Sequence, residues 1–519
     1  MTIGFIDLSI IIIYCAAMAY MGFHFSKKNT STEEYFLGGR SFPGWAIGVS
    51  MIGTSISSVT FIAYPADAFK TTWVRFVPAL AYPLAAILAV KVFIPFFRNN
   101  NVTSAYEYIE ARFSAGLRVY SASVSLLGQI FRISIILYLL ALLMHELTGI
   151  GLSWCVLFSG AVVSIYTIVG GIDAVVWTDV IQTVILFLGG IICIALVAVQ
   201  LPGGFGEILS VGIEHHKFSF ADIKDGMIIP AKWGFSLSEK TVTMLFLMGF
   251  IGWINGHTAD QNMVQRYCAS KSEKDAKHAV WIACLSSIPV WAFYMFLGTA
   301  LYVFFSRFPT TTASEILSGV QKAEQIVPYF IMNYLPIGIR GLVIVSALAA
   351  AMSSLDSSIN AIATISVVDI YRRHLVKNKT DQHYLRVAKI VACIASILML
   401  LGALILIRTT TTTIRDMLML IGSVMTSGIL GLYLLGFFTR RATARAAVIG
   451  IILSTIFTIF MLLHSRDIFG GACRFSFEMY YVGVIGNLLM MIVGYFLSLI
   501  PFCRKEKDLT GLTVWTQEK

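Results

Sequence analysis

Residues 44–69 read GWAIGVSMIGTSISSVTFIAYPADAF, an apolar stretch that is long enough to cross a lipid bilayer. Its centre, from Gly53 to Ser58, places a glycine and several hydroxyl side chains between two short apolar halves. An unwound stretch at such a point frees backbone carbonyls for a cation and helix ends for a solute. The sequence therefore predicts a helix that is broken inside the membrane.

A second segment, 240–265, has the same character. Its apolar run LFLMGFIGWINGHTADQNMVQ is predicted to be interrupted around Gly252 to Gly256. With the opening helix set aside, the two interrupted segments are the first and the sixth spans of the chain. Paired broken helices at matching positions of two halves indicate an inverted-repeat transporter. Close helix packing through small residues is the alternative explanation of these glycines.

The composition places the rest of the chain in a membrane as well. Of the 519 residues, 57% are hydrophobic and only 13% are charged, about half the share that is typical of soluble domains. About 13 segments are long and apolar enough to span a bilayer. They are residues 3–24, 44–69, 72–97, 115–149, 153–170, 173–200, 240–265, 277–305, 339–370, 386–407, 415–438, 442–464 and 478–501. We expect an all-α membrane protein with no inserted soluble domain.

The formal net charge of +10 could indicate binding to nucleic acid, but the basic residues are spread over short connections between apolar segments. Arg40, Arg98, Arg372 and Arg440 are examples. The positive-inside rule then places the N-terminus outside and the C-terminus in the cytoplasm of a bacterial inner (plasma) membrane. No phosphate-binding loop or hydrolase motif is present, so we expect no enzyme. The expected partners are the bilayer and a small solute, with no nucleic acid and no protein partner.

Polar residues inside apolar segments are costly, so they usually mark ion sites or solute pathways. In ALAAAMSSLDSSINAIA, Ser353, Asp356 and Ser357 stand at i, i+3 and i+4 and therefore share one helix face. Their oxygens suit a hard monovalent cation better than a soft metal. Asp179, in the run WTDVIQ, is a second carboxylate at membrane depth. Hydroxyls that only bond back to the preceding helical turn are the alternative.

Arg132 lies in the apolar run QIFRISIILYLL. Arginine stays charged and presents a planar fork that matches a carboxylate. We interpret Arg132 as a binding residue for an anionic solute. Pairing with a buried acid such as Asp179 or Asp356 is the alternative.

Five stretches together resemble the sodium:solute symporter family. They are YFLGGRSFPGW (35–45), TSAYEYIEARF (103–113), GGIDAVVWTDVIQ (170–182), VQRY (264–267) and SSLDSSINAIAT (353–364). The resemblance implies sodium-coupled symport and the leucine-transporter fold, which is built from two inverted five-helix repeats. A single membrane transport domain is then expected over 1–519. Its parts are a leading helix at 3–24, repeat one at 44–200, repeat two at 240–438 and two trailing helices at 442–501.

The resemblance also implies a general sodium site between the broken first core helix and the eighth core helix. The matching positions are the carbonyls of Gly53, Ile56 and Ala350 and the hydroxyls of Ser353 and Ser354. Sodium is then the co-transported ion, with one or two ions per cycle.

Within the family, the chain is similar to the bacterial sialic acid symporters. That similarity implies a second sodium site at Asp179, Ser353, Asp356 and Ser357, where Asp356 replaces a serine. It also implies solute positions at Ser55, Ser57, Thr60, Arg132 and Phe250, while Ala79 replaces a glutamine that contacts the sugar. The predicted function is import of an anionic sugar, such as sialic acid, with sodium by alternating access. A sodium symporter for a neutral sugar or polyol and a non-transporting solute sensor are the alternatives.

Overall fold

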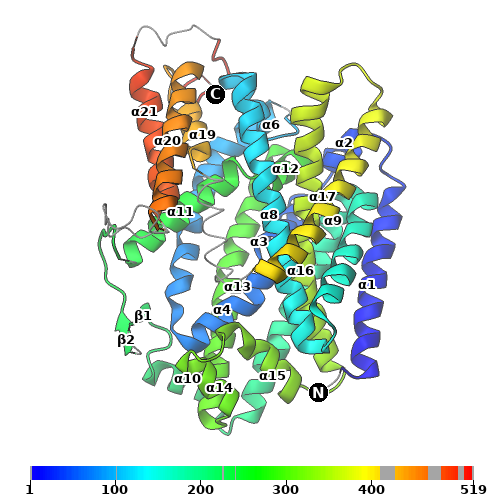
Figure 1. Cartoon of the computed structure of the whole chain (residues 1–519), viewed down its shortest axis with the longest axis vertical. Helices are drawn as coiled ribbons and strands as arrows, with labels where there is room; N and C mark the ends of the chain where they lie inside the picture. Colours follow the sequence, from blue (N-terminus) through cyan, green and yellow to red (C-terminus); the bar gives the residue numbers. More distant parts are fainter. Residues whose placement is uncertain are drawn as a thin grey trace.

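A computed structural model of the chain describes residues 3–100, 102–224, 227–239, 241–409, 427–465, 481–500 and 508–516. Within these ranges the protein is a bundle of helices with one antiparallel two-stranded hairpin, β1 (Ala221–Lys224) and β2 (Met227–Pro230). In Figure 1, α1 lies on one side of the bundle, against α9 and α16, whereas α19, α20 and α21 form a group on the other side.

The helical elements before the hairpin are α1 (Phe5–Ser26), α2 (Thr32–Leu37), η1 (Gly38–Arg40), α3 (Gly44–Ser55), α4 (Ser58–Lys70), η2 (Trp73–Ala81), α5 (Tyr82–Leu88), η3 (Ala89–Phe93), α6 (Ile94–Asn99), α7 (Glu107–Arg112), α8 (Ala115–Thr148), α9 (Leu152–Gln200) and α10 (Gly204–Glu214). Those after it are α11 (Val242–Thr258), α12 (Gln261–Ala269), α13 (Glu273–Arg307), α14 (Thr311–Ser318), η4 (Ala323–Gln325), α15 (Ile326–Tyr334), α16 (Ile339–Ile365), η5 (Ser366–Leu375), α17 (Asp381–Thr409), α19 (Ile429–Phe438), α20 (Ala444–Ser465) and α21 (Val482–Leu497).

In the described part of the chain, eight helices are long and apolar enough to cross a membrane, or up to ten when each of two bent pairs is one span. Within the described residues, each predicted segment overlaps helical structure. Two further apolar helices, α19 and α21, are shorter than a full span in the described part of the chain. Residues 240, 415–426, 478–480 and 501 of the predicted spans lie outside the described residues.

The predicted break in the first interrupted segment is confirmed. The chain leaves helix α3 after Ser55 and enters α4 at Ser58, and the two axes are bent by 56°. Ile56, between them, has an extended backbone with φ −99° and ψ 115°. Since the last carbonyls of a helix have no intrahelical partner, the end of α3 presents free oxygens in the middle of the bundle.

The second interrupted segment is also bent, by 51°, but the predicted place of the break is wrong. Gly252 and Gly256 remain helical within α11, and the chain turns between Thr258 and Gln261. An isolated glycine costs a helix only ~1 kcal/mol, so it marks a break weakly. A helix start is marked more strongly by its cap. The carboxylate of Asp260 accepts the backbone N–H of Asn262 (2.9 Å) and so begins α12.

The predicted spans 153–170 and 173–200 form one element, α9, with a non-helical residue at Gly171. Its φ of +59° favours glycine, and a Cβ there would lie 2.9 Å from the carbonyl oxygen of Tyr35. The hydroxyl of Tyr35 donates to the carbonyl of Ile168 (3.0 Å), and Asn29 donates to Val169 (3.1 Å). These side chains satisfy two carbonyls beside the break, where α9 changes direction.

Connections that were predicted to be cytoplasmic meet at one end of the molecule. Arg118 pairs with Asp369 (2.7 Å) and with Glu110 (2.8 Å), and Arg373 also binds Glu110. Burial opposes the charged form of Glu110, but the hydrogen bonds from Arg373 and Arg118 outweigh it and lower the pKa of this carboxyl group. The connections around 102–114 and 366–375 therefore lie on the same side. Which side of the membrane this is stays a prediction.

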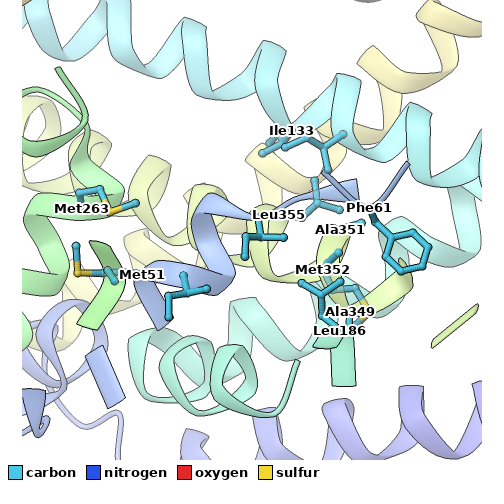
Figure 2. Packing of buried hydrophobic residues seen from close by; sticks show 14 of the residues in the cluster. Met51, Phe61, Ile133, Leu186, Met263, Ala349, Ala351, Met352 and Leu355 are labelled. Carbon is cyan, nitrogen blue, oxygen red and sulfur yellow. The ribbon is translucent and has the colours of Figure 1, made fainter. Parts of the chain in front are cut away.

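Helix α16 is the central element, because almost its whole length is buried between α9, α8, α17 and α1. Figure 2 shows Ala349, Met352 and Leu355 of α16 in the same apolar cluster as Phe61 of α4 and Leu186 of α9. The hydroxyl-rich face of α16 is thus held against the break between α3 and α4 and the break between α11 and α12.

Candidate functional site

The centre of the site is a buried ion pair between Asp179 of α9 and Arg266 of α12. The Nη2 atom of Arg266 lies 2.7 Å from Oδ2 of Asp179, and both side chains are almost fully buried. Ser50 donates to the same carboxylate (2.5 Å), and Ser353 of α16 donates to its other oxygen. Asp179 and Ser353, two predicted ligands of the second sodium site, are therefore in contact.

Arg266 was not predicted as a site residue, although it lies in the motif VQRY. Its Nε donates to Ser50 (2.8 Å), its Nη1 to the Asn262 carbonyl (2.8 Å), and its Nη2 to Asp179 and to Ser357 (2.8 Å). In the sequence, Arg266 follows an apolar span and looks like a basic residue of a connection. Every residue of α12 is buried, which places the guanidinium inside the bundle. It occupies oxygens that the resemblance assigned to sodium.

Asp356 also lies in the site, but on the far side of Ser357. One of its oxygens accepts the hydroxyl of Tyr166 (2.8 Å) and lies 3.4 Å from that of Thr178. Its other oxygen accepts the backbone N–H of Ser357 (2.5 Å). With both acids ionised, Asp179 and Asp356 carry one more charge than Arg266 neutralises. Such a buried excess attracts a cation or a proton.

The positions predicted for the general sodium site converge at the end of α3. A Cβ on Gly53 would lie 2.8 Å from the hydroxyl oxygens of Ser353 and Thr183, so only glycine fits there. The hydroxyl of Thr183 is buried and has no hydrogen-bond partner among the described residues. Ser354 Oγ lies 3.5 Å from the carbonyl oxygen of Thr54. Thr183 was missed because it is on α9, far from these residues in sequence.

Two other predicted positions frame this point. Ile56 is the extended residue after α3, and Ala350 lies one turn before Ser354 on α16. Hydroxyl and carbonyl oxygens from α3, α9 and α16 therefore approach one place, which suits a hard cation.

A cavity of ≈ 240 Å³ opens beside the broken end of α3. Its lining residues come from α3, α5, α8, α11, α12 and the turn between α11 and α12. They are Thr54, Ser55, Tyr82, Arg132, Gly252, Trp253, Asn255, Gly256, His257, Asp260 and Met263. Of the predicted solute positions, Ser55 and Arg132 are part of this lining, whereas Ser57, Thr60 and Phe250 are outside it.

Arg132 pairs neither with Asp179 nor with Asp356, but with a third, partly buried acid. Its Nη1 atom faces Asp260 at 3.6 Å, and its Nη2 atom lies 3.4 Å from the Thr54 carbonyl oxygen. The end of α3 favours a cation, because helix C-termini carry partial negative charge. About a third of the Arg132 side chain (32%) is exposed. The guanidinium is therefore held loosely and faces the cavity.

The opposite wall of the cavity has aromatic and polar character. The rings of Tyr82 and Trp253 are stacked at 4.1 Å. Oδ1 of Asn255 and Nε2 of His257 are buried and have no hydrogen-bond partner among the described residues. A cationic group, a flat aromatic surface and unpaired polar atoms suit a polar molecule with several hydrogen-bonding groups, such as a sugar acid.

Gly252 and Gly256, one turn apart on α11, keep this wall open. No described atom lies within 4 Å of a Cβ added at either position. We expect Gly256→Ala to leave folding intact, because alanine is the better helix former by ~1 kcal/mol. Binding of the solute is expected to weaken about tenfold or more, because a methyl group enters the cavity.

Thermal unfolding and solute titration of the same preparation measure both effects. Gly116→Ala on α8 is the matched control, since a Cβ there also meets open space but lies outside the cavity lining. Equal solute affinity for Gly256→Ala and Gly116→Ala would contradict this placement of the solute.

Comparison with known proteins identifies the family. The sodium:solute symporter family matches residues 35–454 of the chain. The chain belongs to this family. The sodium/sialic acid symporter SiaT of Proteus mirabilis is 33% identical over 493 residues, covering 95% of this chain and 94% of SiaT. NanT of Aliivibrio fischeri, also a sodium/sialic acid symporter, is 32% identical, and the match covers 93% of this chain and 90% of NanT. A sodium/glucose cotransporter of Vibrio parahaemolyticus is 29% identical, and the match covers 88% of this chain and 85% of the cotransporter.

Solved structures agree with this assignment. A sodium-coupled sialic acid symporter in a substrate-bound, outward-open state superposes with a TM-score of 0.85 at 33% identity, covering 96% of this chain and 98% of that one. A nucleobase-cation-symport-1 family transporter shares the fold with a TM-score of 0.59 at 16% identity. The superposition covers 92% of this chain and 97% of that transporter. This member of the sodium:solute symporter family is thus a multi-pass membrane transporter.

Proposed function

We propose that this protein imports sialic acid or a closely related sugar acid together with sodium, by alternating access. The observation that carries the proposal is the position of Arg132, whose guanidinium faces a cavity at the broken end of α3. The two sodium/sialic acid symporters similar along nearly the whole chain support the same solute class.

The two predicted cation positions are part of the proposal. The first uses oxygens of Gly53, Ile56, Ala350, Ser353 and Ser354. The second uses Asp179, Ser353, Asp356 and Ser357 and shares its carboxylate with Arg266. One sodium ion there makes the group of two acids and one arginine neutral. We therefore propose two sodium ions for each anionic solute, which moves one net positive charge inward per cycle.

The finer architecture is part of the proposal. We propose thirteen spans, with the leading helix α1, two inverted five-helix repeats that begin at α3 and α11, and two trailing helices. The bends of 56° and 51° in the first helix of each repeat support this division. The N-terminus is proposed to face the outside, and the C-terminus the cytoplasm, of a bacterial inner membrane.

Uptake of labelled sialic acid into proteoliposomes tests the coupling. We expect uptake in sodium but not in choline. Ser354→Ala is expected to raise the sodium concentration for half-maximal uptake, because Ser354 lies beside the Thr54 carbonyl. Ser396→Ala on α17 is the matched control, since its hydroxyl only bonds back to Ala392 (2.9 Å). Equal uptake by the unmodified protein in sodium and choline would contradict sodium coupling.

The same vesicles test the ion count. An imposed inside-negative potential should accelerate uptake, because each net charge that crosses 100 mV contributes ~2.3 kcal/mol. A rate that is indifferent to voltage would contradict two sodium ions per monoanion.

A neutral sugar or polyol is the second candidate for the solute. Two observations favour it: Arg132 already faces the carboxylate of Asp260, and Ala79 stands where the resemblance implies a glutamine that contacts the sugar. Competition for uptake by sialic acid and by its uncharged methyl ester separates the two candidates.

A further inference from the structure

We infer that Asp260 is an internal counter-ion for Arg132. The carboxylate of the solute takes the place of Asp260 beside the guanidinium. This inference rests on the proposed function and names a residue that sets affinity and specificity at the same site. Two arginines near the broken helices differ in how they are paired. Arg266 lies 2.7 Å from Asp179, and both side chains are buried, whereas Arg132 lies 3.6 Å from Asp260.

The pair of Arg132 and Asp260 is suited to exchange of Asp260 for a solute carboxylate. Its separation is beyond hydrogen-bonding distance, and the side chains of Arg132 and Asp260 are 32% and 24% exposed. Both residues line the cavity, so a solute reaches them without unfolding any element. A charge pair with this access to solvent is worth ~1 kcal/mol or less. A bidentate bond from the solute to the guanidinium is stronger and shorter.

Asp260 is held in place without Arg132. Its Oδ1 atom accepts the backbone N–H (2.9 Å) and the side-chain amide (2.9 Å) of Asn262, and lies 3.4 Å from the amide nitrogen of Gln129. Oδ2 is the oxygen that faces Arg132. When a solute carboxylate takes the guanidinium, Asp260 therefore keeps its position beside the solute.

The position of Asp260 links this exchange to the broken helices. Asp260 lies in the turn between α11 and α12, where the span is bent by 51°. Arg132 contacts Thr54 at the end of α3, in the other broken span. The pair of Arg132 and Asp260 thus bridges these two breaks. A bound sugar acid replaces that bridge through its own carboxylate.

Asp260→Asn tests the exchange, because asparagine caps a helix as well as aspartate does and has nearly the same volume. Sialic acid should bind this variant about fivefold more tightly than the unmodified protein, since one partly exposed ion pair no longer competes. The methyl ester should bind both proteins equally. Asp173→Asn, which removes a carboxylate outside the cavity lining, is the matched control and should leave both affinities unchanged.

Isothermal titration of the purified proteins in sodium gives the affinities. The same titrations in the Arg132→Ala background show whether the effect of Asp260→Asn depends on Arg132. In that background Asp260→Asn should no longer change the affinity. A gain that persists without Arg132, or no gain in its presence, would overturn the exchange while leaving the proposed solute intact. If neither the unmodified protein nor Asp260→Asn binds sialic acid, the proposed solute itself is wrong, and the exchange with it.

Discussion

Arg132→Ala is expected to weaken the binding of sialic acid by about 30-fold to several thousand-fold. The reason is that removing one partner of a hydrogen-bonded charge pair in a closed site costs ~2–5 kcal/mol. Arg132 is the cation of the cavity lining among the described residues, and its guanidinium is held only by contacts of 3.4 and 3.6 Å. Equilibrium binding in detergent, with sodium at a saturating concentration, measures the loss.

The methyl ester of sialic acid is the internal control, because an uncharged solute should be little affected by the substitution. Arg132→Lys should also bind the acid poorly, since lysine lacks the planar fork. Lys91→Ala, which removes an exposed basic residue of η3, should leave both affinities unchanged. An Arg132→Ala variant that still binds sialic acid normally would place the solute elsewhere.

The first break in the fold could be predicted from sequence, whereas the second was misplaced. Between Gly53 and Ser58 a glycine and hydroxyl groups coincide, and hydroxyl side chains compete with helical hydrogen bonding. Around Gly252 and Gly256 glycine is the main signal, and a helix tolerates it. The true turn depends on the cap at Asp260, a residue that reads in sequence as one more polar side chain.

The residues of the predicted second cation site could be chosen from the sequence, but their partners could not. Asp179, Ser353 and Ser357 stand out as polar groups in apolar runs, and the structure brings them together. The choice between Asp260 and Asp179 as the partner of Arg132 depends on the packing of α8 against the broken spans. Arg266 could not be recognised from sequence either, because its burial depends on the position of α12 and not on its neighbours in the sequence.

Asp179→Asn is expected to lower the free energy of unfolding by ~3–5 kcal/mol, the cost of leaving a buried charge without its partner. The Arg266 guanidinium would keep Ser50, Ser357 and the Asn262 carbonyl as acceptors but would lose its counter-charge. Sodium-dependent uptake is expected to fall as well, because Asp179 is the carboxylate shared with the second cation position. Denaturant unfolding in detergent and uptake into vesicles measure the two effects separately.

A double variant separates stability from ion binding. Replacing a buried ion pair by apolar residues of similar volume is often neutral for stability. The pair Asp179→Leu with Arg266→Met is therefore expected to recover much of the lost free energy of unfolding, while uptake stays impaired because no carboxylate faces Ser353. If the double variant regains sodium-dependent uptake together with stability, the Asp179 carboxylate is only structural, and the second sodium ion does not bind beside it.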